Sequence, residues 1–146
     1  MVVAGAFVVA ACGSDGDELS EEEFLAQANE ICRVGNEEIN QLADEILTLE
    51  DEEATEEEVN QFVEEEGPEF RDAVVSNVRG QIADIRDLSG PSDLEEELDP
   101  ILDEASEILD GNADSSPEEF FESEDDDLAE VNSQLGAVGL TACAEA

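Results

Sequence analysis

The segment SEEEFLAQANEICRVGNEEINQLADEILTLE (residues 20–50) decides the fold of this 146-residue chain. Ser20 and Glu23 have the spacing of a capping box, in which the two side chains satisfy free backbone N–H groups of the first helical turn. We therefore predict a helix over residues 21–49, with Cys32 at the edge of its buried stripe. The stripe is formed by residues that recur at alternating intervals of four and three, the period of one helix face: Phe24, Ala28, Ile31, Gly35, Ile39, Leu42, Ile46 and Leu49.

Helical spacing continues after this segment. A second capping box at residues 55–58 opens a helix that Gly67-Pro68 is expected to kink or break, since proline removes a backbone donor and disfavours helical geometry before it. The pattern then resumes and stops at Ser89-Gly90-Pro91. The residues expected on its buried side are Phe70, Val74, Val78, Ile82, Ile85 and Leu88.

A further helix is predicted to begin near Ser92 and to end at Gly111-Asn112. Asp99-Pro100 lies inside it, and we expect a restart there, with Asp99 as N-cap and Pro100 at the first helical position. The buried side is predicted to hold Leu94, Leu98, Ile101, Leu102, Ala105, Ile108 and Leu109.

The last part of the chain carries a third capping signature at residues 116–119 and a final helix with Leu128, Val131 and Leu135, stopped by Gly136 and Gly139. The sequence shows no alternating pattern of paired strands and no internal repeat. The predicted fold is therefore all-α, a bundle of four to five helices over residues 20–146.

Composition excludes several classes of function. The chain has 44 Asp and Glu against 4 Lys and Arg, a net charge of −40, and it contains no His, Lys, Trp or Tyr. Nucleic-acid binding is not expected, because it depends on basic side chains that neutralise phosphates. Without His or Lys there is no imidazole ligand and no Schiff-base nucleophile, so we predict no cofactor, no metal site and no catalytic residue.

The N-terminal residues predict export. Residues 1–11, MVVAGAFVVAA, match the apolar core of a signal peptide and lack the usual basic start, so the true start is expected upstream. The small residues before Cys12 resemble the lipobox of bacterial lipoproteins. That resemblance implies a diacylglyceryl group on Cys12, removal of residues 1–11, and a lipid-anchored flexible tether over residues 12–19. The alternative is an ordinary signal peptide with a chance cysteine.

The number of cysteines predicts a covalent link within the tertiary structure. If Cys12 carries lipid, Cys32 and Cys143 remain, and two thiols of an exported protein are expected to form a disulfide. This bond would attach the first helix to the C-terminal tail. Two separately buried thiols are the alternative, and a metal site is less suited to two cysteines without His.

Three segments together resemble a family of small secreted or lipid-anchored helical proteins of actinobacteria. They are ANEIC at residues 28–32, QIADIRDLSGP at residues 81–91 and GLTAC at residues 139–143. The resemblance covers most of residues 24–143 and implies the bundle and the Cys32–Cys143 bond, but no activity. Val138 departs from the aromatic residue common before the final Gly-Leu pair, and the acidity is unusual for the group.

The acidic residues are expected to form a solvated surface, and Arg79 and Arg86 are expected to pair with carboxylates. Asp110, Asn112 and Asp114 have the spacing that opens a calcium loop, but Ser115 replaces the glycine of the sharp turn, so an EF-hand is not expected. Weak calcium or magnesium binding remains an alternative. The phenylalanines are expected in the core: Phe24, Phe62, Phe70, Phe120 and Phe121.

These observations predict a non-enzymatic binding or structural module, anchored by lipid to the outer face of the cell membrane. An acidic protein that binds or buffers divalent cations is the alternative. A carboxylate-dependent hydrolase ranks third, since nothing singles out two catalytic carboxylates among 44.

Overall fold

The computed structural model describes residues 18–47, 56–122 and 126–145. Within these ranges the protein is all-α and contains no strand, as predicted. The elements are α1 (Glu21–Leu47), α2 (Glu56–Glu65), α3 (Gly67–Arg86), α4 (Ser92–Asp114), α5 (Pro117–Glu122), α6 (Asp126–Ala137) and a 3₁₀ turn at Cys143–Glu145.

The predicted capping box forms at the start of α1. The backbone N–H of Ser20 donates to Glu23 Oε2 at 3.2 Å, and the N–H of Glu23 donates to Ser20 Oγ at 3.3 Å. Beyond this cap, Phe24 and Ala28 of the apolar stripe are buried. The helix is described as far as Leu47, and residues 48 and 49 of the prediction lie outside the described residues.

The predicted interruptions between helices are confirmed at two places. Glu66 separates α2 from α3, and Pro68 lies in the first turn of α3. A backbone N–H in the first turn makes no hydrogen bond within the helix, so proline, which lacks this group, costs no helical hydrogen bond there. The turn between α3 and α4 contains Gly90, and a Cβ there would lie 2.5 Å from Phe24 Cδ2. Glycine therefore lets this turn pack directly on the start of α1. Thr55 of the second capping box lies outside the described residues.

The predicted restart at Pro100 is wrong, because α4 continues through it. Proline costs one backbone hydrogen bond there, but Pro100 is itself exposed, and Leu98, Ile101 and Leu102 beside it are buried. Their burial on one face holds the helix together across the proline. The predicted end at Gly111 is also wrong, since α4 reaches Asp114 and the N–H of Ser115 still donates to Gly111 O at 3.1 Å.

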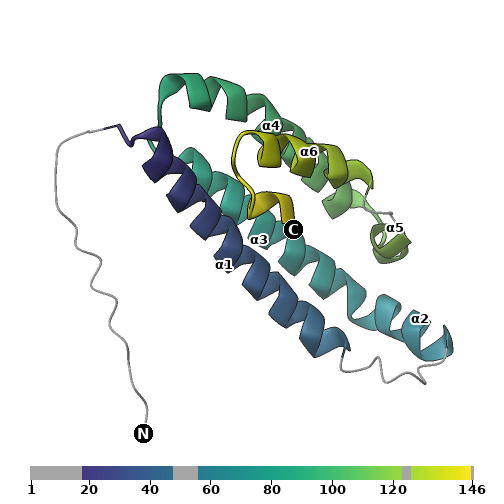
Figure 1. Cartoon of the computed structure of the whole chain (residues 1–146). Helices are drawn as coiled ribbons and strands as arrows, with labels where there is room; N and C mark the ends of the chain where they lie inside the picture. The colour runs from purple at the N-terminus through teal and green to yellow at the C-terminus, as the bar shows by residue number, and fades with distance from the viewer. Residues whose placement is uncertain (1–17, 48–55, 123–125, 146) are drawn as a thin grey trace, which may run out of the picture.

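Helices α1, α3, α4 and α6 surround the core, and α2 and α5 lie together at one end of the molecule (Figure 1). Asn77 of α3 contacts Glu38 of α1, whereas the later Ser89 contacts Leu19, so α1 and α3 run antiparallel. The core contains Phe24 and Ala28 of α1, Val75, Ile82 and Ile85 of α3, most of the predicted apolar residues of α4, and Val131 and Leu135 of α6.

The C-terminal tail completes the core. After α6 the chain turns back across α1 (Figure 1), and Leu140 is fully buried, with 0% of its surface exposed. The turn depends on Gly139, whose φ of +96° lies in the left-handed region that favours glycine. Leu140 N–H donates to Leu135 O at 2.9 Å, and Gly139 N–H donates to Gly136 O at 3.2 Å. Gly136 remains inside α6, so Gly139 alone ends the helix.

The phenylalanines divide between the core and the surface. Phe24 is buried as predicted, but Phe121 is 41% exposed, which corrects its placement in the core. Phe121 stacks on Phe70 with ring centroids 5.8 Å apart, and Phe120 meets it edge-on at 5.4 Å. The three rings therefore form a small aromatic cluster at the surface, between α3 and α5. The side chain of Phe62 lies outside the described residues.

Candidate functional site

The predicted disulfide joins Cys32 of α1 to Cys143 of the tail. Their Cα atoms are 5.0 Å apart, and 111 residues separate them in the sequence. Both cysteines are buried, at 3% and 6% exposure. The bond therefore belongs to the core and is shielded from reductants in solution.

Two asparagines on α1 flank Cys32 and hold the same tail. Asn29 Nδ2 donates to Gly139 O at 3.0 Å, while Asn29 Oδ1 accepts the N–H of Ala142 at 2.8 Å. Asn36 Nδ2 donates to Ala142 O at 2.9 Å. Residues three before and four after Cys32 lie on the same helix face. Neither asparagine was among the predicted site residues, although their spacing around Cys32 places them on the face that carries the cysteine.

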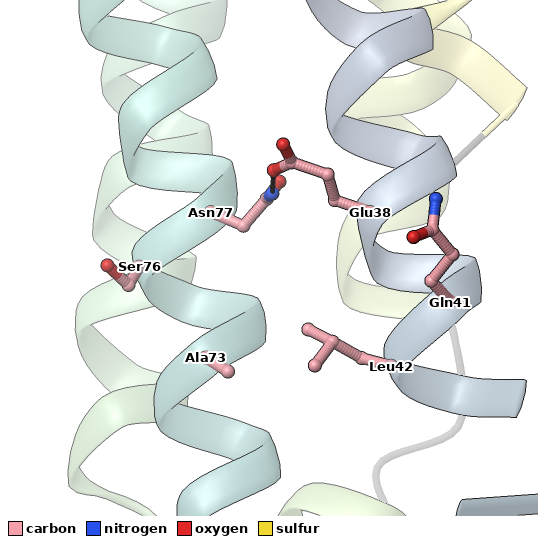
Figure 2. Close-up of a pocket in the computed structure, with 6 residues that line it drawn as sticks. All are labelled: Glu38, Gln41, Leu42, Ala73, Ser76 and Asn77. Atoms are coloured by element: carbon pink, nitrogen blue, oxygen red, sulfur yellow. Dashed lines mark hydrogen bonds between the residues drawn. The ribbon is translucent and has the colours of Figure 1, made fainter. Parts of the chain in front are cut away.

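A groove runs between α1 and α3 on the surface of the bundle. It consists of two adjoining cavities of about 500 and 420 Å³, which share Glu38, Ser76 and Asn77. Figure 2 shows the first cavity: Leu42 and Ala73 point toward each other, and Asn77 reaches Glu38 across the gap between the helices. This groove was not predicted from the sequence, because it arises from the pairing of two helices.

A chain of hydrogen bonds crosses the groove. Gln81 is 9% exposed, and its Nε2 donates to Asn77 Oδ1 at 2.7 Å. Asn77 Nδ2 in turn donates to Glu38 Oε2 at 2.8 Å. Gln81 packs over Gly35, where a Cβ would lie 2.1 Å from its Nε2. The glycine of α1 thus makes room for the glutamine that fixes the orientation of Asn77 and Glu38.

The four arginines of the chain each pair with a carboxylate, which confirms the prediction for Arg79 and Arg86. Arg79 pairs with Asp110, and Arg86 pairs with Asp103 at 2.5 Å, so both ion pairs join α3 to α4. Arg71 is more enclosed, with 15% of its side chain exposed, and donates to Ser115 O as well as to Asp72.

Within the described ranges, carboxylate pKa values are lowered at three surface positions. Hydrogen bonds from Ser20 lower the pKa of Glu23, and those from Ser116 lower the pKa of Glu119. The hydrogen bond from Arg33 lowers the pKa of Glu30, and the same pair raises the pKa of Arg33 above its ordinary value. These shifts belong to helix caps and to an exposed ion pair, so they do not mark an acid or a base of a catalytic site.

The residues with calcium-loop spacing form no loop. Asp110, Asn112 and Asp114 all belong to the last turns of α4, and Asp110 pairs with Arg79. Across the described part of the chain, no three His, Cys, Asp or Glu side chains are grouped so as to hold a metal ion. Weak binding of calcium or magnesium stays a prediction.

Cys12 and the expected signal peptide lie outside the described residues, so lipidation stays a prediction. Among the helices of the described ranges, none has the length and apolarity that crossing a bilayer needs.

Comparison of the chain with family models, with curated proteins and with solved structures finds no match.

Proposed function

We propose that the protein is a non-enzymatic binding module, exported and held at the outer face of the cell membrane by a lipid on Cys12. The observation that carries this proposal is the buried Cys32–Cys143 disulfide. Structural disulfides form and persist in oxidising compartments outside the cytosol and are rare within it. The third cysteine then remains for lipid attachment at the end of the apolar N-terminal segment.

Binding is favoured over a purely structural role by the groove between α1 and α3. In this groove Gln81, buried to about nine-tenths, donates to Asn77, which in turn donates to Glu38, so polar groups at the surface have a defined arrangement. Buried polar networks of this kind fix one arrangement of the groups they contain. The resemblance to lipid-anchored actinobacterial proteins agrees with a location at the outer face of the cell membrane and is part of the same proposal.

The test is expression of the chain in an actinobacterial host, followed by membrane fractionation and mass spectrometry. We expect a mature N-terminus at Cys12 that carries diacylglycerol, and protein in the membrane fraction. Cys12→Ser should move the protein out of that fraction, whereas Ser14→Ala, which keeps the cysteine, should leave it there. A mature chain that begins elsewhere, or membrane association that survives Cys12→Ser, would refute the anchor.

A further inference from the structure

We propose that the groove between α1 and α3 binds a lysine- or arginine-bearing segment of a partner protein, an inference that rests on the proposed function as a binding module. The groove is defined by the residues that line its two cavities: Glu30, Ile31, Val34, Gly35, Glu38, Gln41 and Leu42 of α1, and Ala73, Ser76, Asn77, Gly80, Gln81 and Asp84 of α3.

The chemistry of the groove is mixed in a way that suits a long basic side chain. Ile31, Val34 and Leu42 supply apolar surface, and Val34 is 42% exposed although it is a large apolar residue. Carboxylates of Glu38 and Asp84 stand beside this surface. Lysine and arginine have an apolar stem and a charged head, so they cover apolar surface while the head stays at a polar site.

The carboxylate of Glu38 is held in place before any partner arrives. Asn77 Nδ2 donates a hydrogen bond to Glu38 Oε2 at 2.8 Å, and Gln81 Nε2 donates one to Asn77 Oδ1. Both amide groups therefore have a fixed orientation. An ionised carboxylate has about four acceptor positions, and the bond from Asn77 uses one of them. A group oriented in advance loses less conformational entropy on binding than a free side chain does.

Charge complementarity selects a cation. Among the described residues that line the groove, none is basic. Arg33 pairs with Glu30 at the rim, and the other three arginines pair with carboxylates outside the groove, so Glu38 and Asp84 have no arginine partner. The net charge of −40 draws cations toward every face of the protein. In the groove, the carboxylate of Glu38, which accepts from Asn77, shares the lining with the exposed side chain of Val34.

The length of the groove suits a peptide. Glu30 and Leu42 at its two ends are twelve residues apart on α1, which corresponds to about 18 Å of helix at about 1.5 Å per residue. An extended chain rises about 3.3 Å per residue, so the groove accommodates about five residues. Basic residues at alternate positions of such a segment can place their charged groups beside the carboxylates of Glu38 and Asp84. Its apolar side chains can then pack on Val34.

The test uses the full chain with its disulfide intact and the blocked pentapeptide acetyl-Lys-Leu-Lys-Leu-Lys-amide as probe, in 0.15 M salt to screen diffuse attraction. NMR chemical-shift changes should concentrate on the groove. Glu38→Gln keeps an acceptor for Asn77 and removes the charge, and it should weaken binding by about fivefold, as expected for one well-placed ion pair. Gly80→Leu should also abolish most binding, since a Cβ at Gly80 meets nothing within 4 Å and the side chain can enter the groove without displacing its walls.

Glu96→Gln is the matched control, because Glu96 is exposed on α4 and its loss removes the same charge away from the groove. It should leave affinity unchanged. Equal weakening by Glu38→Gln and Glu96→Gln, or shifts spread over the whole surface, would overturn the proposal in favour of nonspecific attraction. Binding of spermidine as tight as that of the peptide would overturn it in favour of a free polyamine. The lipid anchor is tested separately at Cys12, so either result stands without the other.

Discussion

Asn29 makes hydrogen bonds that neither helix propensity nor apolar patterning requires. Its amide donates to Leu25 O at 2.8 Å and to Gly139 O at 3.0 Å, and its carbonyl accepts from the backbone of Ala142. One side chain therefore satisfies backbone groups of α1 and of a tail 110 or more residues away. Irregular backbone packed against a core needs such partners.

Asn29→Ala is expected to lower the free energy of unfolding by about 1–3 kcal/mol, because partly buried backbone groups of the tail lose their hydrogen bonds. Asn40→Ala on the same helix, at an exposed position, is the control and should have little effect. Urea unfolding with the disulfide intact measures both. Equal, small effects of the two substitutions would show that the disulfide alone positions the tail.

The capping boxes give stability a defined pH dependence. The folded-state pKa of Glu23 is lowered from its ordinary 4.5 by Ser20, and that of Glu119 is lowered by Ser116. A carboxyl with a depressed folded pKa contributes stability that is present above its unfolded pKa and lost as pH falls through the folded value. Ser20→Ala should therefore raise the pKa of Glu23 toward 4.5 and leave the titration of Glu119 unchanged, as measured by carboxyl NMR. If the pKa of Glu23 is the same in this variant as in the wild-type protein, hydrogen bonds from Ser20 do not lower it.

At the level of elements, the contact between α1 and α3 depends on a glycine opposite a glutamine. A Cβ at Gly35 would lie within 2.3 Å of Gln81 Nε2 and Cδ, so Gly35→Ala must displace a side chain that is 9% exposed and break its bond to Asn77. Overpacking of this kind costs about 1–3 kcal/mol, against a gain of about 1 kcal/mol in helix propensity.

We therefore expect Gly35→Ala to destabilise the protein by up to roughly 2 kcal/mol. Gly80→Ala is the matched comparison, since a Cβ there meets nothing within 4 Å, and it should stabilise by roughly 0.5–1 kcal/mol. Thermal unfolding of both variants measures the difference. Stabilisation by both substitutions would show that Gln81 moves aside at no cost and that the packing at Gly35 is loose.

At the level of the whole molecule, the disulfide closes a loop with a sequence separation of 111 residues. In the chain-entropy model such a link stabilises the folded state by up to about 4–5 kcal/mol, because it restricts the unfolded chain. The double substitution Cys32→Ala and Cys143→Ala should lower the urea midpoint accordingly, and reduction of the wild-type protein in urea should do the same. An unchanged midpoint would mean that the hydrogen bonds of the tail and the burial of Leu140 stabilise the folded state equally well without the disulfide.

Net charge is the second property of the whole molecule that affects stability. With a charge of −40, self-repulsion opposes the compact state. Raising NaCl from 0.1 to 2 M should raise the melting temperature, since the Debye length falls from about 10 Å at 0.1 M to about 3 Å at 1 M. Most of the rise should occur below about 0.5 M, where screening changes fastest, and this separates it from later salting-out effects. A melting temperature that falls with salt would contradict the argument.

The sequence by itself determined the helices and much of the core. A 3.6-residue period over residues 94–109 identified every buried residue that α4 contributes, and two Ser–Glu pairs at the spacing of a capping box marked the starts of α1 and α5 correctly. Cysteine count predicted the disulfide. These features depend on residues close together in the sequence or on the number of cysteines, so they can be predicted without knowing which helices pack against each other.

Features that depend on partners distant in sequence became evident from the folded structure. Pro100 stays inside α4 because packing on the core outweighs one lost hydrogen bond. Phe121 stacks on Phe70 of α3 at the end of the molecule and stays 41% exposed instead of entering the core. The groove requires Gly35 and Gln81 to meet, although 45 residues lie between them in the sequence. Periodicity specifies which face of a helix is apolar, but the contact of two faces is fixed by the shapes of side chains on both helices, and these complement each other only after folding.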